Sequence, residues 1–191
     1  MYYRSDIIYV YDGSFYGLLC CAAESMVKKE QPFRIVKEND MLPSIFECRR
    51  IETCEAIARK LLLSIGRNIS LHVKRFIYLA FLSQLEDRVT MIVDFIHMAY
   101  SRGRQILEDR TAEPIHTLWK AVVNLQNESH LFKGFVRFTD YGGVMVSEIE
   151  PKNSVLPLIK DHFVSRYPRE LLFIYDKTHH QALLAKCGKG R

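Results

Sequence analysis

The chain has 191 residues, of which 48% are hydrophobic and 26% are charged. This composition excludes a disordered or low-complexity chain and predicts a globular protein, long enough for one ordinary domain with a sizeable core. The formal net charge of +5 permits an anionic partner but does not require one, because the basic residues are spread along the sequence rather than gathered in an arm or tail.

The five cysteines predict free thiols rather than disulfides or a zinc site. Their number is odd, Cys20 and Cys21 are adjacent, and no Cys-x-x-Cys occurs. We expect them to be buried thiols in a reducing compartment. The start of the chain shows no signal peptide, and charged residues interrupt every apolar run well before a membrane-spanning length of about 20 residues. We therefore expect a cytoplasmic protein with no membrane partner.

The N-terminal segment predicts a strand, a tight turn and a helix. The strand is Ile7–Tyr11, and Ser14 suits the N-cap of a helix whose apolar residues keep helical spacing. Main-chain N–H groups at such a helix start can hold a phosphate or carboxylate, so Asp12, Gly13 and Ser14 form a candidate anion-binding turn. A short turn that needs glycine explains the same residues. Weaker strand patterns follow at residues 32–36 and 45–48.

Between residues 53 and 130 the hydrophobic pattern is helical. Apolar stripes with a period near 3.6 residues begin at Ile57, Val73 and Val89, and Pro114 suits the first turn of a fourth helix. Residues 101–113 are polar and poorly periodic, which predicts a loop. We expect residues 53–130 to form a helical subdomain that is inserted into, or packed on, a small sheet.

Gly134 marks a return to the two-residue period that is typical of strands. The pattern predicts strands at 135–139 and 144–150 around a hairpin turn, then a helix over 155–167 capped by Asn153 or Ser154, and final strands at 171–175 and 181–185. The order strand, strand, helix, strand, strand predicts an α+β fold. We expect a single domain over residues 1–191, in which both ends of the chain share one small, mainly antiparallel sheet.

Titratable and cationic side chains gather in the last third of the chain. A histidine can transfer protons at neutral pH, and an arginine presents a planar fork that matches phosphate. Helical spacing places His162 and Arg166 one turn apart, at the margin of the buried face of their helix. We expect this margin to form one cleft with His130 and Arg137. The candidate acid–base residues are Glu128, His130, Glu150 and His162, and the candidate nucleic-acid-binding residues are Lys133, Arg137 and Arg166.

Each assignment has a structural alternative. His162 at a helix margin can be a satisfied structural residue, and Arg137 can pair with a glutamate across the strands. His179 and His180 are a possible metal pair, although neighbours in a strand point to opposite faces. The sequence has no nucleophile elbow, phosphate-binding loop or metalloprotease motif, so it predicts no cofactor, no metal site and no particular reaction.

Several short motifs match one family of proteins. They are Asp12 to Phe15 with Gly17, Glu128 with His130, Gly134 to Phe138, Ile149 to Pro151, Val155 to Pro157, His162 with Phe163, Arg166, and Phe173 to Asp176. Through these motifs essentially the whole chain resembles a bacterial family of uncharacterised proteins assigned to DNA metabolism and DNA repair. After Asp176 that family commonly has a Lys-Arg turn, whereas this chain continues with Lys177, Thr178 and two histidines. If the turn contacts phosphate, its contact here is weaker and pH-dependent.

The resemblance implies a DNA-repair context and a protein partner. Members resemble a domain fused to uracil-DNA glycosylases, and others are encoded beside a radical SAM protein of DNA modification. The resemblance implies no iron–sulfur cluster on this chain. Three hypotheses follow: a DNA-binding accessory protein, which we favour, a nucleic-acid-processing enzyme that uses histidine and glutamate as acids and bases, and a protein-interaction scaffold that binds no nucleic acid.

Overall fold

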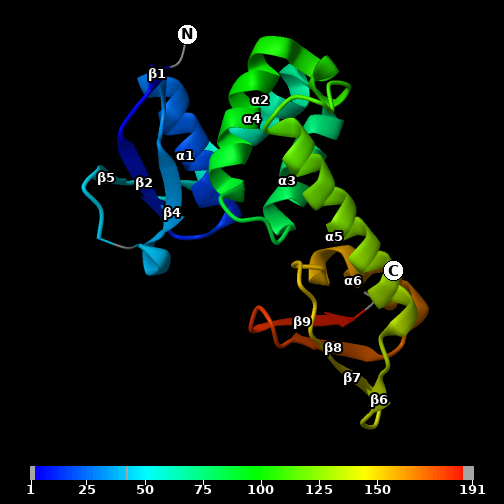
Figure 1. Cartoon of the computed structure of the whole chain (residues 1–191). Coiled ribbons are helices and arrows are strands. Elements are labelled where there is room, and N and C mark those ends of the chain that lie inside the picture. The colour runs from blue at the N-terminus through cyan, green and yellow to red at the C-terminus, as the bar shows by residue number, and fades with distance from the viewer. Residues whose placement is uncertain (1–2, 42, 187–191) are drawn as a thin grey trace. The chain divides into compact units, whose positions relative to one another are not determined.

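The computed structural model describes residues 3–41 and 43–186 (Figure 1). The contacts within the chain divide it into two compact units, where the sequence led us to expect one domain. The first unit comprises Met1–Phe81 and Leu85–Val122, and the second comprises Leu82–Gln84 and Val123–Arg191. Helix α5 (Ile115–Phe135) begins in the first unit and ends in the second.

The first unit begins with short strands around one helix: β1 (Tyr3–Arg4), β2 (Ile7–Tyr11), α1 (Phe15–Lys28), β3 (Glu30–Gln31), β4 (Arg34–Lys37), a 3-10 turn (Glu38–Asp40) and β5 (Glu47–Arg50). β2 lies between β4 and β5 in a three-stranded parallel sheet, and β1 pairs with β3. Parallel neighbours need a crossover connection, because a tight hairpin would reverse the chain. α1 supplies that connection between β2 and β4.

The predicted helical region is confirmed. It contains α2 (Glu55–Asn68), α3 (Leu71–Leu82), α4 (Arg88–Arg102), a 3-10 segment (Gly103–Leu107) and the first turns of α5. Ile65, Val73 and Ile92, which lie on the predicted stripes, are 0% exposed and form part of the core of the first unit. Pro114 directly precedes the first residue of α5, as its missing N–H group favours.

The second unit contains the predicted order of strand, strand, helix, strand, strand. Its elements after α5 are β6 (Thr139–Asp140), β7 (Val144–Ile149), α6 (Leu156–Arg166), β8 (Leu171–Asp176) and β9 (Gln181–Lys186). They form a sheet in the order β6-β7-β8-β9. The outer pairs are antiparallel, whereas β7 and β8 are parallel because α6 crosses over between them. The α+β class is thereby confirmed.

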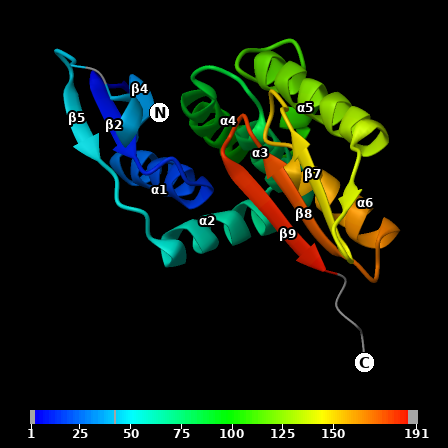
Figure 2. The same cartoon turned by 90° about the horizontal axis from the view of Figure 1, so that it is seen from below.

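Helix α6 packs on one face of this sheet (Figure 2). Ile159 and Phe163 on α6 are 0% and 2% exposed, and Leu172 and Ile174 on β8 are both 0% exposed. Side chains alternate along a strand, so the residues between these positions point to the opposite face of the sheet. One of them, Phe173 on β8, is partly exposed.

Three detailed predictions are wrong. The two ends of the chain do not share a sheet: the described strands form three separate sheets. Of residues 135–139 only Thr139 belongs to a strand, because α5 continues through Gly134 to Phe135, and the Val136 N–H still bonds to the Phe132 carbonyl at 3.1 Å. One glycine costs a helix only about 1 kcal/mol relative to alanine, too little to end a packed helix. Neither Asn153 nor Ser154 caps α6, whose N-cap position is Val155.

The cysteines differ in their surroundings. Cys20 and Cys21 on α1 are buried free thiols as predicted, Cys54 is partly buried, and Cys48 on β5 is exposed, contrary to expectation. Burial raises the pKa of the Cys21 thiol well above its ordinary value. Cys187 lies outside the described residues. Within the described ranges, no helix has the length and hydropathy that a bilayer crossing requires.

Candidate functional site

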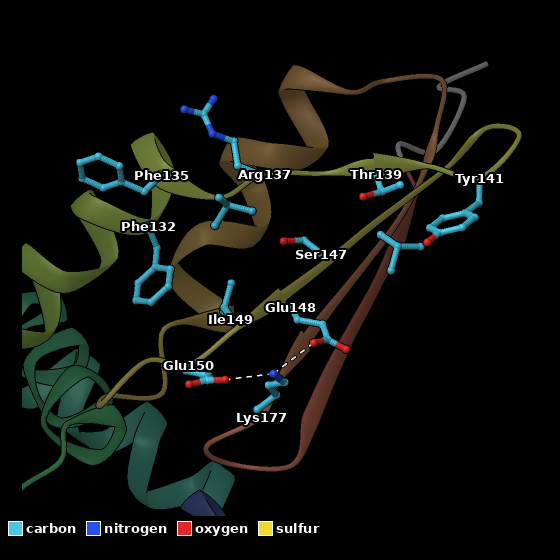
Figure 3. A pocket seen from close by; sticks show the side chains of 12 residues that line it. Phe132, Phe135, Arg137, Thr139, Tyr141, Ser147, Glu148, Ile149, Glu150 and Lys177 are labelled. Atoms are coloured by element: carbon cyan, nitrogen blue, oxygen red, sulfur yellow. Dashed lines mark hydrogen bonds and ion pairs between the residues drawn. The ribbon is translucent and has the colours of Figure 1, made fainter.

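A pocket of about 590 Å³ opens beside β7 (Figure 3). Its walls are the end of α5, the segment that leads from α5 to β6, the second half of β7, and Lys177 at the end of β8. The pocket exists because β6 is short. β6 pairs with β7 only at Thr139–Val146 and Asp140–Met145, so the preceding chain separates from β7. The side chains around the opening include Phe132, Phe135, Arg137, Glu148, Glu150 and Lys177.

Lys177 forms ion pairs with both glutamates of this pocket, which leaves the three side chains with a net charge of −1. Its Nζ lies 3.2 Å from a Glu148 oxygen and 3.0 Å from a Glu150 oxygen. Hydrogen bonds to Glu150 and Glu148 raise the pKa of Lys177. The structural alternative paired Arg137 with one of these glutamates across the strands. In the structure both glutamates pair with Lys177 instead. Arg137 is exposed and makes no hydrogen bond or ion pair with any residue in the described part of the chain.

The other candidate cations and histidines lie on two helices. His130 and Lys133 are on α5, exposed and partly exposed respectively. His162 and Arg166 are exposed on α6, where the His162 ring contacts the Phe163 ring at 4.9 Å and Arg166 lies 5.8 Å from the Tyr167 ring centroid. Of the predicted site residues, the pocket beside β7 brings together Arg137 and Glu150. A single cleft that includes all four predicted cations and histidines stays a prediction.

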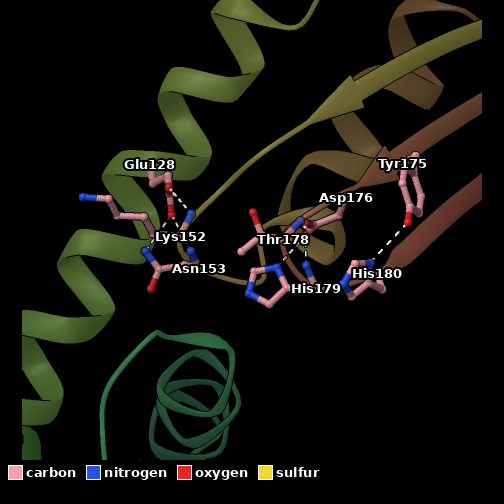
Figure 4. A network of polar contacts seen from close by, with 8 residues as sticks. All are labelled: Glu128, Lys152, Asn153, Tyr175, Asp176, Thr178, His179 and His180. Atoms are coloured by element: carbon pink, nitrogen blue, oxygen red, sulfur yellow. Dashed lines mark hydrogen bonds and ion pairs between the residues drawn. The ribbon is translucent and has the colours of Figure 1, made fainter.

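Glu128 has a structural environment (Figure 4). One of its oxygens accepts the main-chain N–H of Lys152 at 2.7 Å, and the other accepts the main-chain and side-chain nitrogens of Asn153 at 2.8 and 2.6 Å. The three hydrogen bonds satisfy two main-chain donors and one side-chain donor of the loop before α6. The hydrogen bonds of the loop therefore engage the Glu128 carboxylate, which was predicted to be an acid–base residue.

An aspartate–histidine pair was missed by the sequence analysis. The buried carboxylate of Asp176 accepts the N–H groups of Thr178 and His179 at 3.0 and 3.1 Å, and its second oxygen lies 2.7 Å from His179 Nδ1 (Figure 4). A carboxylate accepts hydrogen bonds, so Nδ1 carries a proton in this contact. The signal in the sequence was an aspartate three residues before a histidine, directly after an apolar strand.

His179 and His180 do not act as a pair. The His180 ring lies 3.4 Å from the Tyr175 hydroxyl, whereas the His179 ring is bonded to Asp176. Within residues 3–41 and 43–186, no group of three His, Cys, Asp or Glu side chains has the arrangement of a metal site. The metal-pair alternative therefore has no geometric support in this turn.

The model of a family described as a domain of unknown function, DUF4130, matches residues 86–189, more than half of the chain. The chain belongs to the DUF4130 family. Neither the curated proteins nor the solved structures give a match. The DUF4130 region contains the pocket beside β7, the Glu128 contacts and the Asp176–His179 pair.

The candidate anion-binding turn lies outside the DUF4130 region. Ser14 caps α1 as predicted: its Oγ accepts the Gly17 N–H at 2.9 Å. Asp12 accepts the Ser14 N–H at 2.9 Å and the Thr53 hydroxyl at 2.8 Å. Partial burial raises the pKa of Asp12, but these hydrogen bonds outweigh burial and hold the pKa below its ordinary value. A carboxylate already faces the helix start, which favours the structural turn over anion binding.

Proposed function

We propose that this DUF4130 chain is an accessory protein of DNA metabolism that binds nucleic acid through its second unit. The observation that supports the proposal is a group of cations there that pair with no carboxylate. Glu148 and Glu150 are held by Lys177, and the Glu128 carboxylate is occupied by the N–H groups of a loop. The cations Lys133, Arg137 and Arg166 have no carboxylate partner among the described residues.

Unpaired cations at a surface favour a polyanion. A protein that neutralises phosphates with lysine and arginine releases the counterions condensed on DNA, which stabilises the complex at low salt. The enzyme hypothesis has less support. Of its four candidates, Glu128 and Glu150 are engaged in other contacts, and His130 and His162 are exposed with no carboxylate partner in the described chain.

The experiment is fluorescence anisotropy with labelled single- and double-stranded oligonucleotides. We expect a dissociation constant of about 10⁻⁴ to 10⁻⁶ M at physiological salt, the range of non-specific binding. Arg137→Ala and Arg166→Ala should each weaken binding. Arg59→Ala is the matched control, because it removes the same charge from an arginine that is paired with Glu55. Absence of binding at low salt, or equal loss with the Arg59 variant, contradicts the proposal.

The partner is proposed from the family resemblance alone. We propose that the chain cooperates with a radical SAM protein of DNA modification or with a uracil-DNA glycosylase. Size-exclusion chromatography of the purified chain mixed with each purified protein from the same organism tests this part. We expect co-elution with one of the two, and separate elution from both contradicts it.

A further inference from the structure

The second unit presents an open sheet face opposite α6. The strand register places Val146 on β7 and Leu184 on β9 directly beside Phe173, at the centre of this face. Leu184 is 66% exposed, and Phe173 and Val146 are partly exposed. Figure 2 shows the strands β7, β8 and β9 with α6 on their far side. An uncovered apolar face of this kind usually marks a binding surface.

Two aromatic rings share this face on the central strand β8. Phe173 and Tyr175 are two residues apart, so both side chains point away from α6, and both are partly exposed. Their spacing along the strand is about 6.6 Å, close to two steps of about 3.4 Å along a DNA strand. A single strand extended to about twice its stacked spacing can therefore place neighbouring bases at the two rings. Four-stranded sheets use aromatic residues in this way to stack unpaired bases.

The charges around the open face suit a phosphate backbone. Lys186 on β9 pairs in register with Leu171, so it shares the face with Phe173, and it is exposed without a carboxylate partner in the described chain. Glu148, which lies beside Tyr175 in the strand register, shares Lys177 with Glu150, so this ion pair offsets part of its negative charge. Unpaired Arg137 lines the pocket beside β7 from the segment between α5 and β6, with its guanidinium directed away from β7 (Figure 3). Bases on an apolar centre and phosphates on cationic margins are the pattern of single-strand binding.

We propose that this open face binds single-stranded DNA by stacking two bases on Phe173 and Tyr175. The inference rests on the proposed function and specifies its ligand and surface. A duplex fits poorly, because its bases are already stacked and paired and cannot lie flat on the two rings. This role also gives a function to the two aromatic side chains of the motif Phe173 to Asp176.

The test compares ring-deleting and ring-retaining variants of the full chain. The probe is a labelled single-stranded DNA of about 12 nucleotides, with the matched duplex and the matched RNA as further arms. Phe173→Leu and Tyr175→Leu fill space without a ring, and each should weaken single-strand binding by about 5- to 150-fold. Phe173→Trp and Tyr175→Phe should retain binding. Leu63→Ala, which removes an exposed apolar side chain on α2 outside this face, should change it little. Thermal melts by circular dichroism confirm that each variant is folded.

The outcomes separate this inference from the proposed function. If the leucine variants bind like the wild type while Arg137→Ala weakens binding, the inference fails and the proposed function stands. If no nucleic acid binds at low salt, the proposed function fails as well. Tighter binding of the duplex or the RNA than of single-stranded DNA overturns the inference. A dimer in light scattering that Leu184→Ala disrupts also overturns it, because a second copy then occupies the face.

Discussion

The carboxylate of Glu128 on α5 accepts both the main-chain and the side-chain nitrogen of Asn153, at 2.8 and 2.6 Å. Asn153 is 8% exposed, and its side-chain oxygen in turn accepts the Gln84 N–H at 2.7 Å. One asparagine thus joins three segments of the second unit that are distant in sequence. This relationship gives the glutamate and the asparagine at these positions a structural role.

The first prediction concerns the stability that Glu128 provides. Glu128→Ala leaves the N–H of buried Asn153 without its partner, so we expect the free energy of unfolding to fall by about 2–3 kcal/mol. Urea denaturation measures this loss. Glu52→Ala, at an exposed glutamate, is the control and should change stability little. A Glu128→Ala protein as stable as the wild type that no longer binds DNA would instead give Glu128 a role in binding.

Two glycines should respond to alanine in opposite ways. A Cβ at Gly17 would overlap the Asp12 carboxylate and approach Thr53 Oγ1 to 2.8 Å, so Gly17→Ala should destabilise the first unit by about 1–3 kcal/mol. A Cβ at Gly134 meets nothing within 4 Å, and Gly134→Ala should stabilise α5 by up to about 1 kcal/mol. Thermal melts measure the change in stability of both variants. If Gly17→Ala and Gly134→Ala change stability equally, the close approach of Gly17 to Asp12 is contradicted.

His97 on α4 should make stability depend on pH. It is 3% exposed, its Nε2 lies 3.1 Å from Ser25 Oγ, and burial lowers its pKa from 6.5 to about 4. The unfolded chain therefore binds a proton between these values when the native protein does not. Stability is fully present above pH 6.5 and falls as the pH drops toward 4, by about 3 kcal/mol from this group.

A pH series of urea denaturations measures the contribution of His97. His97→Gln should flatten the fall in stability between pH 6.5 and 4, whereas His72→Gln, at an exposed histidine of α3, should leave the curve unchanged. Parallel curves for the wild type and His97→Gln contradict the assignment.

The Asp176–His179 pair predicts a defined tautomer. Asp176 accepts from His179 Nδ1, so nuclear magnetic resonance should show the proton of the neutral ring on Nδ1 rather than Nε2. Asp176→Ala removes this partner and the acceptor of two turn N–H groups, and should cost about 2–4 kcal/mol of stability. A neutral ring protonated on Nε2 in the wild type rules out the proposed hydrogen bond.

Local patterns were sufficient to predict most elements from the sequence. Ser14 was predicted as an N-cap, and its Oγ does accept the Gly17 N–H. The predicted strands at 171–175 and 181–185 differ from β8 and β9 by one residue at their ends. Both signals depend on residues close in sequence: a side chain three positions before its donor, or an alternation of apolar and polar residues.

Contacts between distant residues could not be predicted in the same way. Lys177 was not recognised as the partner of Glu148 and Glu150, because 29 and 27 residues separate them and only the parallel register of β7 and β8 brings them together. The strand direction itself depends on the α1 and α6 crossovers. Gly134 was predicted to mark the change from helix to strand, but it lies inside α5. The residue type alone does not distinguish a glycine inside a helix from one that ends it.

The salt dependence of DNA binding tests the central claim most directly. Counterion release makes the logarithm of the binding constant fall linearly with the logarithm of salt concentration, with a slope proportional to the number of phosphate contacts. We predict a steep fall for the wild type, and a slope shallower by roughly 1.4 to 1.8 for the Arg137→Ala, Arg166→Ala double variant. No binding at low salt, or the same slope in both proteins, would contradict a nucleic-acid interface built on these two arginines.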